Sequence, residues 1–256
     1  MKKIILTIVF VLVAGTVFAQ YKMSIKKADN TTEDIWVHDM INITFTNVAF
    51  TCGTNTIIYA GQTYNTVQIG TQCWLKENLN VGTRINGGTD QTSTAGTIEK
   101  YCYNDNDANC TSYGGLYQWA EAVQYLNGTT NTTSAVPAFT GNVQGICPTG
   151  WHIPTWAEYN TTLNTTVGGS GNSLKEIGQG LGAGSGTNTS GFSALLRGYR
   201  NYDGGFLNLG YYTLFWSSSE NSGIGAGSMG LDFDNSDIHQ DGYNKVYGYS
   251  VRCVKD

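Results

Sequence analysis

The sequence predicts an α+β fold in which two helices accompany Gly-rich antiparallel hairpins and disulfides staple the chain. Apolar residues follow strand spacing at both ends of the main domain and helical spacing in its middle. This order differs from the regular strand–helix alternation of a parallel sheet. Glycine accounts for 33 of 256 residues and proline for only 3, which suits many turns between short strands. Six cysteines are available for disulfides.

Composition excludes several classes of protein. Charged residues make up 13% of the chain, about half of ordinary usage. Aromatic residues reach 12%, whereas a disordered chain is rich in charge and poor in aromatics. The formal net charge is -5, and because neutralising phosphates requires Lys and Arg, we expect no nucleic-acid partner.

Residues 1–19 have the pattern of a signal peptide. Two lysines precede an apolar run over 4–14, and small residues at Val17 and Ala19 allow cleavage after Ala19. The run is shorter than the ~20 residues needed to span a bilayer, so we expect no transmembrane segment in the mature chain. We therefore expect a mature protein that starts at Gln20 and is secreted or held at the cell surface.

Export would place the cysteines in an oxidising compartment, where an even number indicates disulfides. A zinc site would need closely spaced Cys or His pairs, which the sequence lacks. Many connectivities are open to six cysteines, and their spacing alone does not choose among them. The cysteines are Cys52, Cys73, Cys102, Cys110, Cys147 and Cys253.

Residues 20–46 are predicted to form an N-terminal β-hairpin segment, separate from the main domain over 47–256. Apolar and polar residues alternate over 21–26, Asp29-Asn30 is a turn signal, and a second apolar set follows over 35–45. A hairpin of this size buries too little surface to be stable alone. We expect it to dock on the main domain or on a neighbouring protein.

The first half of the main domain is predicted to contain three short strands and two helices. The strands are expected over 54–59, 63–69 and 72–76. The first helix is predicted over 115–126, where four apolar residues share one face. The second begins at Thr155, where the sequence Thr-Trp-Ala-Glu forms a capping box.

The C-terminal half is predicted to consist of hairpins. Asp203-Gly204 and Asp241-Gly242 are turn signals, and 214–216 is a strand core. Alternation over 247–254 predicts a last strand. The polar stretch 127–140 is expected to be a loop.

The sequence shows no catalytic motif. The alternating glycines of 178–188 are not framed by the strand and helix of a dinucleotide-binding site, so we expect a flexible linker there. His152 has neither a nucleophile nor an orienting acid in its local sequence, which predicts a neutral, non-catalytic histidine. We assign no catalytic residue.

Two Asp/Asn-rich stretches carry the oxygen ligands that calcium prefers. Neither follows the EF-hand pattern, and Asn and Asp also form turns through their own side chains, the interpretation that we favour. We expect no other cofactor. The calcium candidates are Asp105, Asp107, Asp232 and Asp234.

Tyrosines are concentrated in the last third of the chain, among Gly, Asn and Ser. This mixture is typical of binding loops, where rigid amphipathic rings combine with adaptable polar contacts. The same rings would also suit the core of a Gly-rich sheet, and the sequence leaves both interpretations open. The ligand-binding candidates, which we expect the hairpin turns to bring to one sheet edge, are Tyr202, Phe206, Tyr211, Tyr243, Asp234 and Asn235.

Several segments resemble a known family. They are TVQIGTQCWLKENL at 66–79, GLYQWA at 115–120, GICPTGWHIPT at 145–155, and GFSAL, FWSSSE and SVRC nearer the C-terminus. Over about residues 60–256 the chain resembles the Fibrobacter succinogenes major paralogous domain. Residues 23–45 resemble a short hairpin that precedes many exported proteins of gut and soil Bacteroidetes.

The resemblance implies a C-type-lectin-like fold, which also includes the formylglycine-generating enzymes, and an exported protein of bacteria that live on polysaccharides. It implies that Cys147 pairs with Cys253. With Cys102 and Cys110 expected to close a short loop, Cys52 and Cys73 are left for each other. The chain lacks the Glu-Pro-Asn and Trp-Asn-Asp triplets of true C-type lectins.

We therefore expect a non-catalytic binding or adhesion module that recognises a glycan or a surface protein through its Tyr/Asn/Gly-rich loops. The alternatives are an enzyme related to formylglycine-generating or glycan-acting proteins, and a structural component of the cell surface. An enzyme would gather titratable groups in one concave pocket, whereas a binder would expose an aromatic patch without one.

Overall fold

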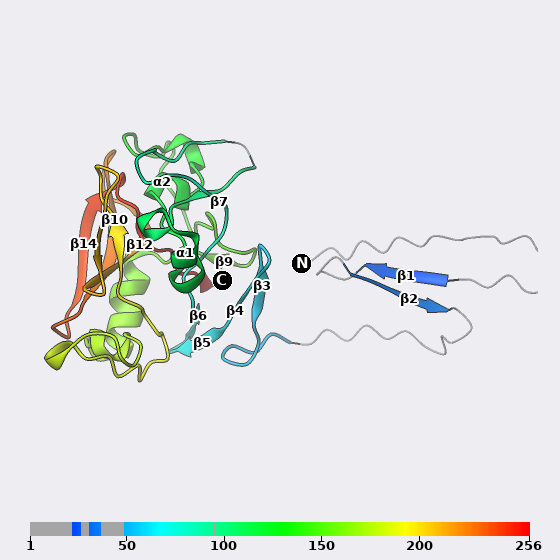
Figure 1. Ribbon diagram of the computed structural model, residues 1–256, viewed down its shortest axis with the longest axis horizontal. Helices are drawn as coiled ribbons and strands as arrows, with labels where there is room; N and C mark the ends of the chain where they lie inside the picture. The colour runs from blue at the N-terminus through cyan, green and yellow to red at the C-terminus, as the bar shows by residue number, and fades with distance from the viewer. Residues whose placement is uncertain (1–21, 27–30, 37–48, 95) are drawn as a thin grey trace, which may run out of the picture. The chain divides into compact units, whose positions relative to one another are not determined.

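The computed structural model describes residues 22–26, 31–36, 49–94 and 96–256, and the chain divides into two units, Met1–Phe50 and Thr51–Asp256. In the first unit, β1 (Lys22–Lys26) and β2 (Thr32–Trp36) pair antiparallel (Figure 1). Both strands fall within the segment for which the sequence predicts a hairpin. The predicted signal peptide, its cleavage site and the Asp29-Asn30 turn lie outside the described residues.

A four-stranded sheet brings the two ends of the second unit together. Its order is β5–β6–β15–β9, so the last strand of the chain lies between two earlier ones. Val254 is opposite Trp74 on one side and His152 on the other. A hairpin of β3 and β4 precedes this sheet. Strands form within the predicted ranges 54–59 and 72–76, whereas the single strand predicted over 63–69 is divided between β4 and β5, which belong to different sheets. The bounds are β3 (Ile57–Tyr59), β4 (Gln62–Tyr64), β5 (Thr66–Ile69), β6 (Gln72–Leu75), β9 (Trp151–His152) and β15 (Val254–Lys255).

The five-stranded sheet, ordered β11–β10–β12–β13–β14, contains the long strands of the C-terminal half (Figure 1). Strands β10 and β12 pair in parallel, and the other neighbours pair antiparallel. The turn at Asp203-Gly204 joins β10 to β11, as the sequence predicts. The bounds are β10 (Arg197–Arg200), β11 (Phe206–Leu209), β12 (Tyr212–Glu220), β13 (Gly225–Asp232) and β14 (Ile238–Asn244).

The predicted turn at Asp241-Gly242 is wrong. Both residues lie inside β14, opposite Ser228 and Gly227 of β13. The chain reverses several residues earlier, between the end of β13 and the start of β14. A Cβ at Gly242 would stand 2.4 Å from the side-chain amide nitrogen of Asn221, which ends an exposed side chain that can move aside.

The first predicted helix is shorter than its apolar pattern suggests. Helix α2 spans only Trp119–Ala122. The residues before it are extended, because Tyr117 exchanges two backbone hydrogen bonds with Tyr249. The helix ends where Gln124 and Tyr125 adopt positive φ angles.

Helix α1 (Asp107–Tyr113) forms in the Asp/Asn-rich stretch for which the sequence suggests a turn or a calcium loop. Asn106 is its N-cap, and its side-chain oxygen accepts a hydrogen bond of 3.0 Å from the Ala108 amide. The Asp107 carboxylate lies in the first turn, where the helix dipole favours negative charge. The local chemistry of Asn and Asp therefore begins a helix here.

The capping box at Thr155 is confirmed. The Glu158 amide donates to Thr155 Oγ1 at 3.2 Å, and the Thr155 amide donates to Glu158 Oε2 at 2.8 Å. The segment continues as a π-helix, η4 (Glu158–Asn164).

The Gly-rich stretch 178–188 is a packed loop, so the expected flexible linker is wrong. The Leu181 amide donates to the Phe233 carbonyl at 2.7 Å. A Cβ on Gly184 would stand 2.2 Å from that same carbonyl oxygen, so the loop lies directly against the end of β13. The remaining short elements are β7 (Thr83–Arg84), β8 (Glu99–Lys100), η2 (Tyr103–Asp105), η3 (Leu126–Gly128), η5 (Gly171–Ser173) and η6 (Gly182–Gly184).

Disulfides and aromatic residues consolidate the second unit, which is mostly β with short helices. The rings of Tyr249 and Trp216 pack with centroids 4.2 Å apart, and both side chains are buried, so some C-terminal tyrosines are core residues. The disulfides are those predicted above, Cys52–Cys73, Cys102–Cys110 and Cys147–Cys253. The described residues contain no helix with the length and apolar character needed to cross a membrane.

Candidate functional site

A shallow groove of about 520 Å³ opens where the start of β12, the end of β13 and the length of β14 meet. Along β14, alternate residues point to the same face of the sheet, which places His239, Asp241 and Tyr243 together. The eight lining residues of this groove, called the β14 groove below, are Asn208, Tyr211, Tyr212, Asp232, Phe233, His239, Asp241 and Tyr243.

A glycine shapes the floor of the β14 groove. Tyr212 is opposite Asp232 in the register of β12 and β13. Its hydroxyl lies so close over Gly230 that a Cβ on that residue would stand 2.4 Å from the oxygen. Glycine is therefore required for the tyrosine ring to lie against the sheet.

The groups around the β14 groove are uncharged rings and hydrogen-bonding polar atoms. Burial raises the pKa of both Tyr212 and Tyr243, whose hydroxyls are hydrogen bonded to each other, so both stay neutral near pH 7. Nε2 of His239 lies 2.7 Å from Oδ2 of Asp232. The Asp241 carboxylate is exposed, and no described residue donates a hydrogen bond to it.

One aromatic ring of the groove faces solvent. Tyr211 packs edge-on against Phe233 with ring centroids 4.8 Å apart. Its side chain nevertheless remains 58% exposed. The contact fixes the orientation of the ring while leaving a face free for a partner.

The structure brings only part of the predicted ligand-binding set together. Tyr211 and Tyr243 line the β14 groove. Tyr202 packs against Tyr247, with ring centroids 6.0 Å apart, and Phe206 packs against Tyr103 at 5.4 Å. Neither Tyr202 nor Phe206 lines the groove. The other two candidates, Asp234 and Asn235, follow it in the chain reversal after Phe233 and bond to each other at 3.1 Å.

Sequence reasoning did not identify His239, Asp241, Asp232 or Asn208 as members of one site. The alternation His-x-Asp-x-Tyr over 239–243 was the available signal, because it places three functional side chains on one strand face. Taking Asp241-Gly242 as a turn concealed that alternation.

The calcium candidates have protein partners. Asp105 Oδ1 accepts from the Gly87 amide at 2.8 Å, and Asp107 Oδ1 accepts from Arg84 Nε at 2.7 Å. Asp232 bonds to His239, and Asp234 bonds to Asn235, as described above. Within the described ranges, no group of three or more His, Cys, Asp or Glu side chains is arranged to hold a metal ion.

Buried lysines supply positive charge in two of the loops. The Lys175 ammonium donates to the carbonyls of Asp232 and Asn235 at 2.6 and 2.8 Å. The fully buried Lys245 ammonium lies over the Trp119 ring and is surrounded by five oxygens. These are Glu220 Oε1 at 2.5 Å, the carbonyls of Gly223, Thr133 and Thr130 at 3.0, 3.1 and 3.3 Å, and the Thr129 hydroxyl at 3.4 Å.

His152 bridges two carboxylates, whereas the sequence predicts a histidine with no acidic partner. Its Nδ1 lies 2.7 Å from Asp256 Oδ1, and its Nε2 lies 3.0 Å from Glu158 Oε1. Burial alone lowers the pKa of His152, but the hydrogen bonds and charges of Glu158 and Asp256 outweigh burial and raise it. Both ring nitrogens are occupied, so the histidine ties the C-terminus to the capped helix and is not free to act as a base.

Comparison with known proteins places the chain in a family. No curated protein and no solved structure matches it. The model of one family, described as the Fibrobacter succinogenes major domain, matches residues 67–255. This match covers the five-stranded sheet, all of the four-stranded sheet except Thr66, and every lining residue of the β14 groove. The chain therefore belongs to the Fibrobacter succinogenes major domain family.

Proposed function

We propose that the chain is an exported, non-catalytic binding module that recognises a neutral glycan in the β14 groove. The observation that carries the proposal is the meeting of an exposed tyrosine ring with exposed and half-buried hydrogen-bonding groups around one open hollow. We further propose that these elements belong to a C-type-lectin-like fold, as the resemblance implies.

The chemistry of the β14 groove suits a sugar. A pyranose ring presents a face of C–H groups, which packs on a flat aromatic ring such as Tyr211. Its hydroxyls need acceptors and donors. The Asp241 carboxylate supplies unengaged acceptors, and the exposed side-chain amide of Asn208 supplies both kinds of group.

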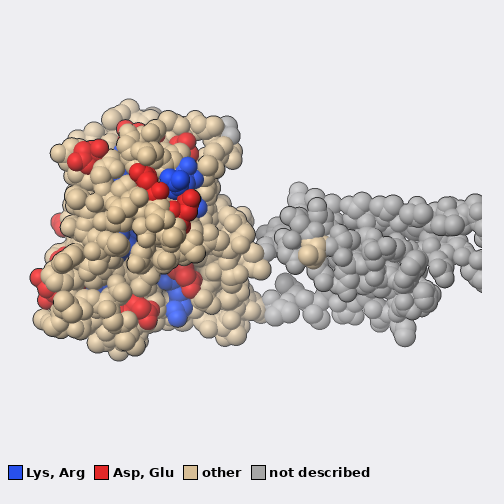
Figure 2. All heavy atoms as spheres, viewed as in Figure 1, with Lys and Arg blue, Asp and Glu red and all other residues tan. Residues whose placement is uncertain are grey.

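The charges of the β14 groove favour a neutral ligand. Its lining contains Asp232 and Asp241 and neither Lys nor Arg. An anionic ligand would meet these two carboxylates without a cation to offset them. Figure 2 shows that most of the visible face of the second unit is uncharged, with Asp and Glu in scattered clusters and Lys and Arg in a few places.

The openness of the β14 groove and its residue types support binding without catalysis. Glycoside hydrolysis uses a pair of carboxyl groups, and of the two carboxylates in this lining, Asp232 is already bonded to His239. An extracellular location is compatible with the three disulfides, which persist in oxidising compartments.

A glycan array probed with the labelled mature chain tests this proposal. The array should carry neutral saccharides beside sialylated, sulfated and uronic-acid-containing ones. We expect signals on neutral saccharides and none that depend on an acidic group. A folded protein that bound no neutral saccharide, or only acidic ones, would overturn the proposal.

A further inference from the structure

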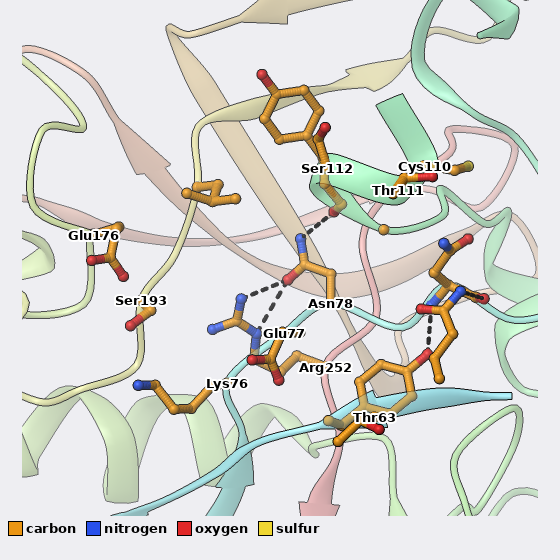
Figure 3. Close-up of a pocket in the computed structure, with 16 residues that line it drawn as sticks. Thr63, Lys76, Glu77, Asn78, Cys110, Thr111, Ser112, Glu176, Ser193 and Arg252 are labelled. Carbon is orange, nitrogen blue, oxygen red and sulfur yellow. Dashed lines mark hydrogen bonds between the residues drawn. The ribbon is translucent and has the colours of Figure 1, made fainter. Parts of the chain in front are cut away.

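A second cavity, of about 450 Å³, opens on another part of the domain (Figure 3). It is bounded by β4, the segment after β6, the end of α1 and the loop around Ser193. None of its lining residues belongs to the β14 groove. Cavities of this size hold small molecules in many proteins.

The buried guanidinium at the floor of this cavity is already engaged. Arg252 donates from Nε and Nη2 to Asn78 Oδ1 at 3.1 and 2.7 Å, and from Nη1 to the Phe192 carbonyl. It also stacks on the Phe192 ring at 4.2 Å. Burial lowers the pKa of Arg252 to about 10, so it remains a cation at neutral pH. Arg252 therefore contributes positive charge to the cavity, but these hydrogen-bond donors are already engaged by Asn78 and Phe192.

The ammonium of Lys76 is free. Lys76 is half-buried in the wall of the cavity, and its ammonium forms no hydrogen bond or ion pair with any described residue. Two carboxylates, Glu77 and Glu176, line the same cavity, yet neither approaches the ammonium within the 4.0 Å of an ion pair.

Glu77 and Glu176 differ in whether a carboxylate oxygen is still free to accept a hydrogen bond from a ligand. Both oxygens of Glu77 are engaged by Asn65, through its amide and its side chain, at 2.7 Å each. Glu176 accepts one hydrogen bond, from Asn188 to Oε2 at 3.1 Å, so its Oε1 is available. Figure 3 shows Lys76 and Glu176 arriving from different segments, with Ser193 between them in that view.

We propose that this cavity binds a small zwitterion, a free α-amino acid with an apolar side chain. The ligand carboxylate pairs with Lys76, in the field of Arg252, and the ligand ammonium pairs with Oε1 of Glu176. The apolar side chain lies toward Leu195, which also lines the cavity.

Charge balance selects a zwitterion over a simple ion. An anion would satisfy Lys76 but leave Glu176 unpaired and repelled, and a cation would do the reverse. A molecule with one charge of each sign satisfies both groups, and charge-assisted hydrogen bonds in a partly enclosed site are among the strong ones.

The test is a titration of the full mature chain with L-leucine, monitored by calorimetry or NMR shifts. N-acetyl-L-leucine and L-leucinamide, which each lack one of the two charges, serve as matched ligands. We expect saturable binding of L-leucine and roughly tenfold or greater weakening for each blocked form, as for the loss of one charge-assisted hydrogen bond.

Two variants test which charged group of the ligand each residue binds. Lys76→Met should weaken L-leucine yet leave L-leucinamide unaffected, because the amide has no carboxylate to lose a partner. Glu176→Gln should weaken L-leucine yet leave N-acetyl-L-leucine unaffected. Lys255→Met, at a lysine that does not line the cavity, is the control and should bind like the unmodified chain.

Two results would overturn the proposal. One is no saturable binding of L-leucine up to its solubility limit by the folded protein. The other is binding that neither variant changes. Because the cavity and the β14 groove share no residue, either result leaves the glycan proposal standing, and failure on the glycan array leaves this one standing.

Discussion

The ammonium of Lys245 and the carboxylate of Glu220 lie 2.5 Å apart, and the lysine side chain is closed to solvent. Glu220 ends β12, and Lys245 follows β14, so the pair joins two strands that are not neighbours in their sheet. The other oxygens around the ammonium come from the polar loop over 129–133 and from Gly223. A single lysine thus organises three segments, as a bound cation does in other proteins.

Replacing Lys245 with Met should destabilise the domain by roughly 3–5 kcal/mol, because it leaves the Glu220 carboxylate without its buried partner. Urea denaturation of the two proteins measures the difference. The double variant Lys245→Met, Glu220→Gln should recover part of the loss, since it removes the uncompensated charge. Equal stability of the Lys245→Met variant and the unmodified chain would contradict this role.

The same arrangement predicts a fold that is independent of calcium. The ammonium groups of Lys175 and Lys245 already donate hydrogen bonds to the carbonyls of these loops, so those oxygens have a cation beside them and need no metal ion. Melting temperature and glycan binding should be the same in EDTA and in added calcium. A rise in melting temperature that follows calcium concentration would show a site elsewhere among the aspartates, since a ligand stabilises the state that it binds.

Stability should depend on pH through His152 and its partner Glu158. The raised pKa of His152 means that its contribution is complete below its unfolded value of about 6.5 and is lost as pH rises through the folded pKa. Burial alone raises the pKa of Glu158, but hydrogen bonds from His152 and Thr155 lower it overall. That contribution is present above the unfolded value of about 4.5 and is lost as pH falls through the folded pKa.

Urea denaturation across pH 4 to 9 measures this dependence, and His152→Asn is the informative variant. The free energy of unfolding of the variant should fall below that of the unmodified chain most strongly near pH 5 to 6. The variant should also show a smaller loss of stability as pH rises, because the two carboxylates stabilise the imidazolium, which it lacks. An identical pH profile for the variant and the unmodified chain would show that the ring is neutral in the folded protein.

Local signals predict local structure well in this chain. The capping box at Thr155 and the turn at Asp203-Gly204 each depend on residues within a few positions of one another, and both are confirmed. The pairing Cys147–Cys253, across 106 residues, came from a family resemblance, because spacing alone does not determine a disulfide of that length.

Features that depend on distant contacts were missed. The partner Asp256 of His152 is at the far end of the chain, and nothing in the local sequence announces it. Gly242 resembles a turn residue, but it lies inside β14, opposite Gly227 of β13. The predicted turn therefore interrupts the strand that carries His239, Asp241 and Tyr243, and the sequence predicts only part of the site.

The central claim, that the β14 groove binds a neutral glycan through Tyr211, is tested most directly by two matched tyrosine variants. Tyr211 and Tyr202 are both largely exposed, at 58% and 65%, but only Tyr211 lines the groove. Affinity for the strongest neutral saccharide from the array would be measured by calorimetry for each. We expect Tyr211→Ala to weaken binding by about 1–3 kcal/mol and Tyr202→Ala to leave it unchanged. Equal affinity of both variants and the unmodified chain, with all three folded, would contradict the claim.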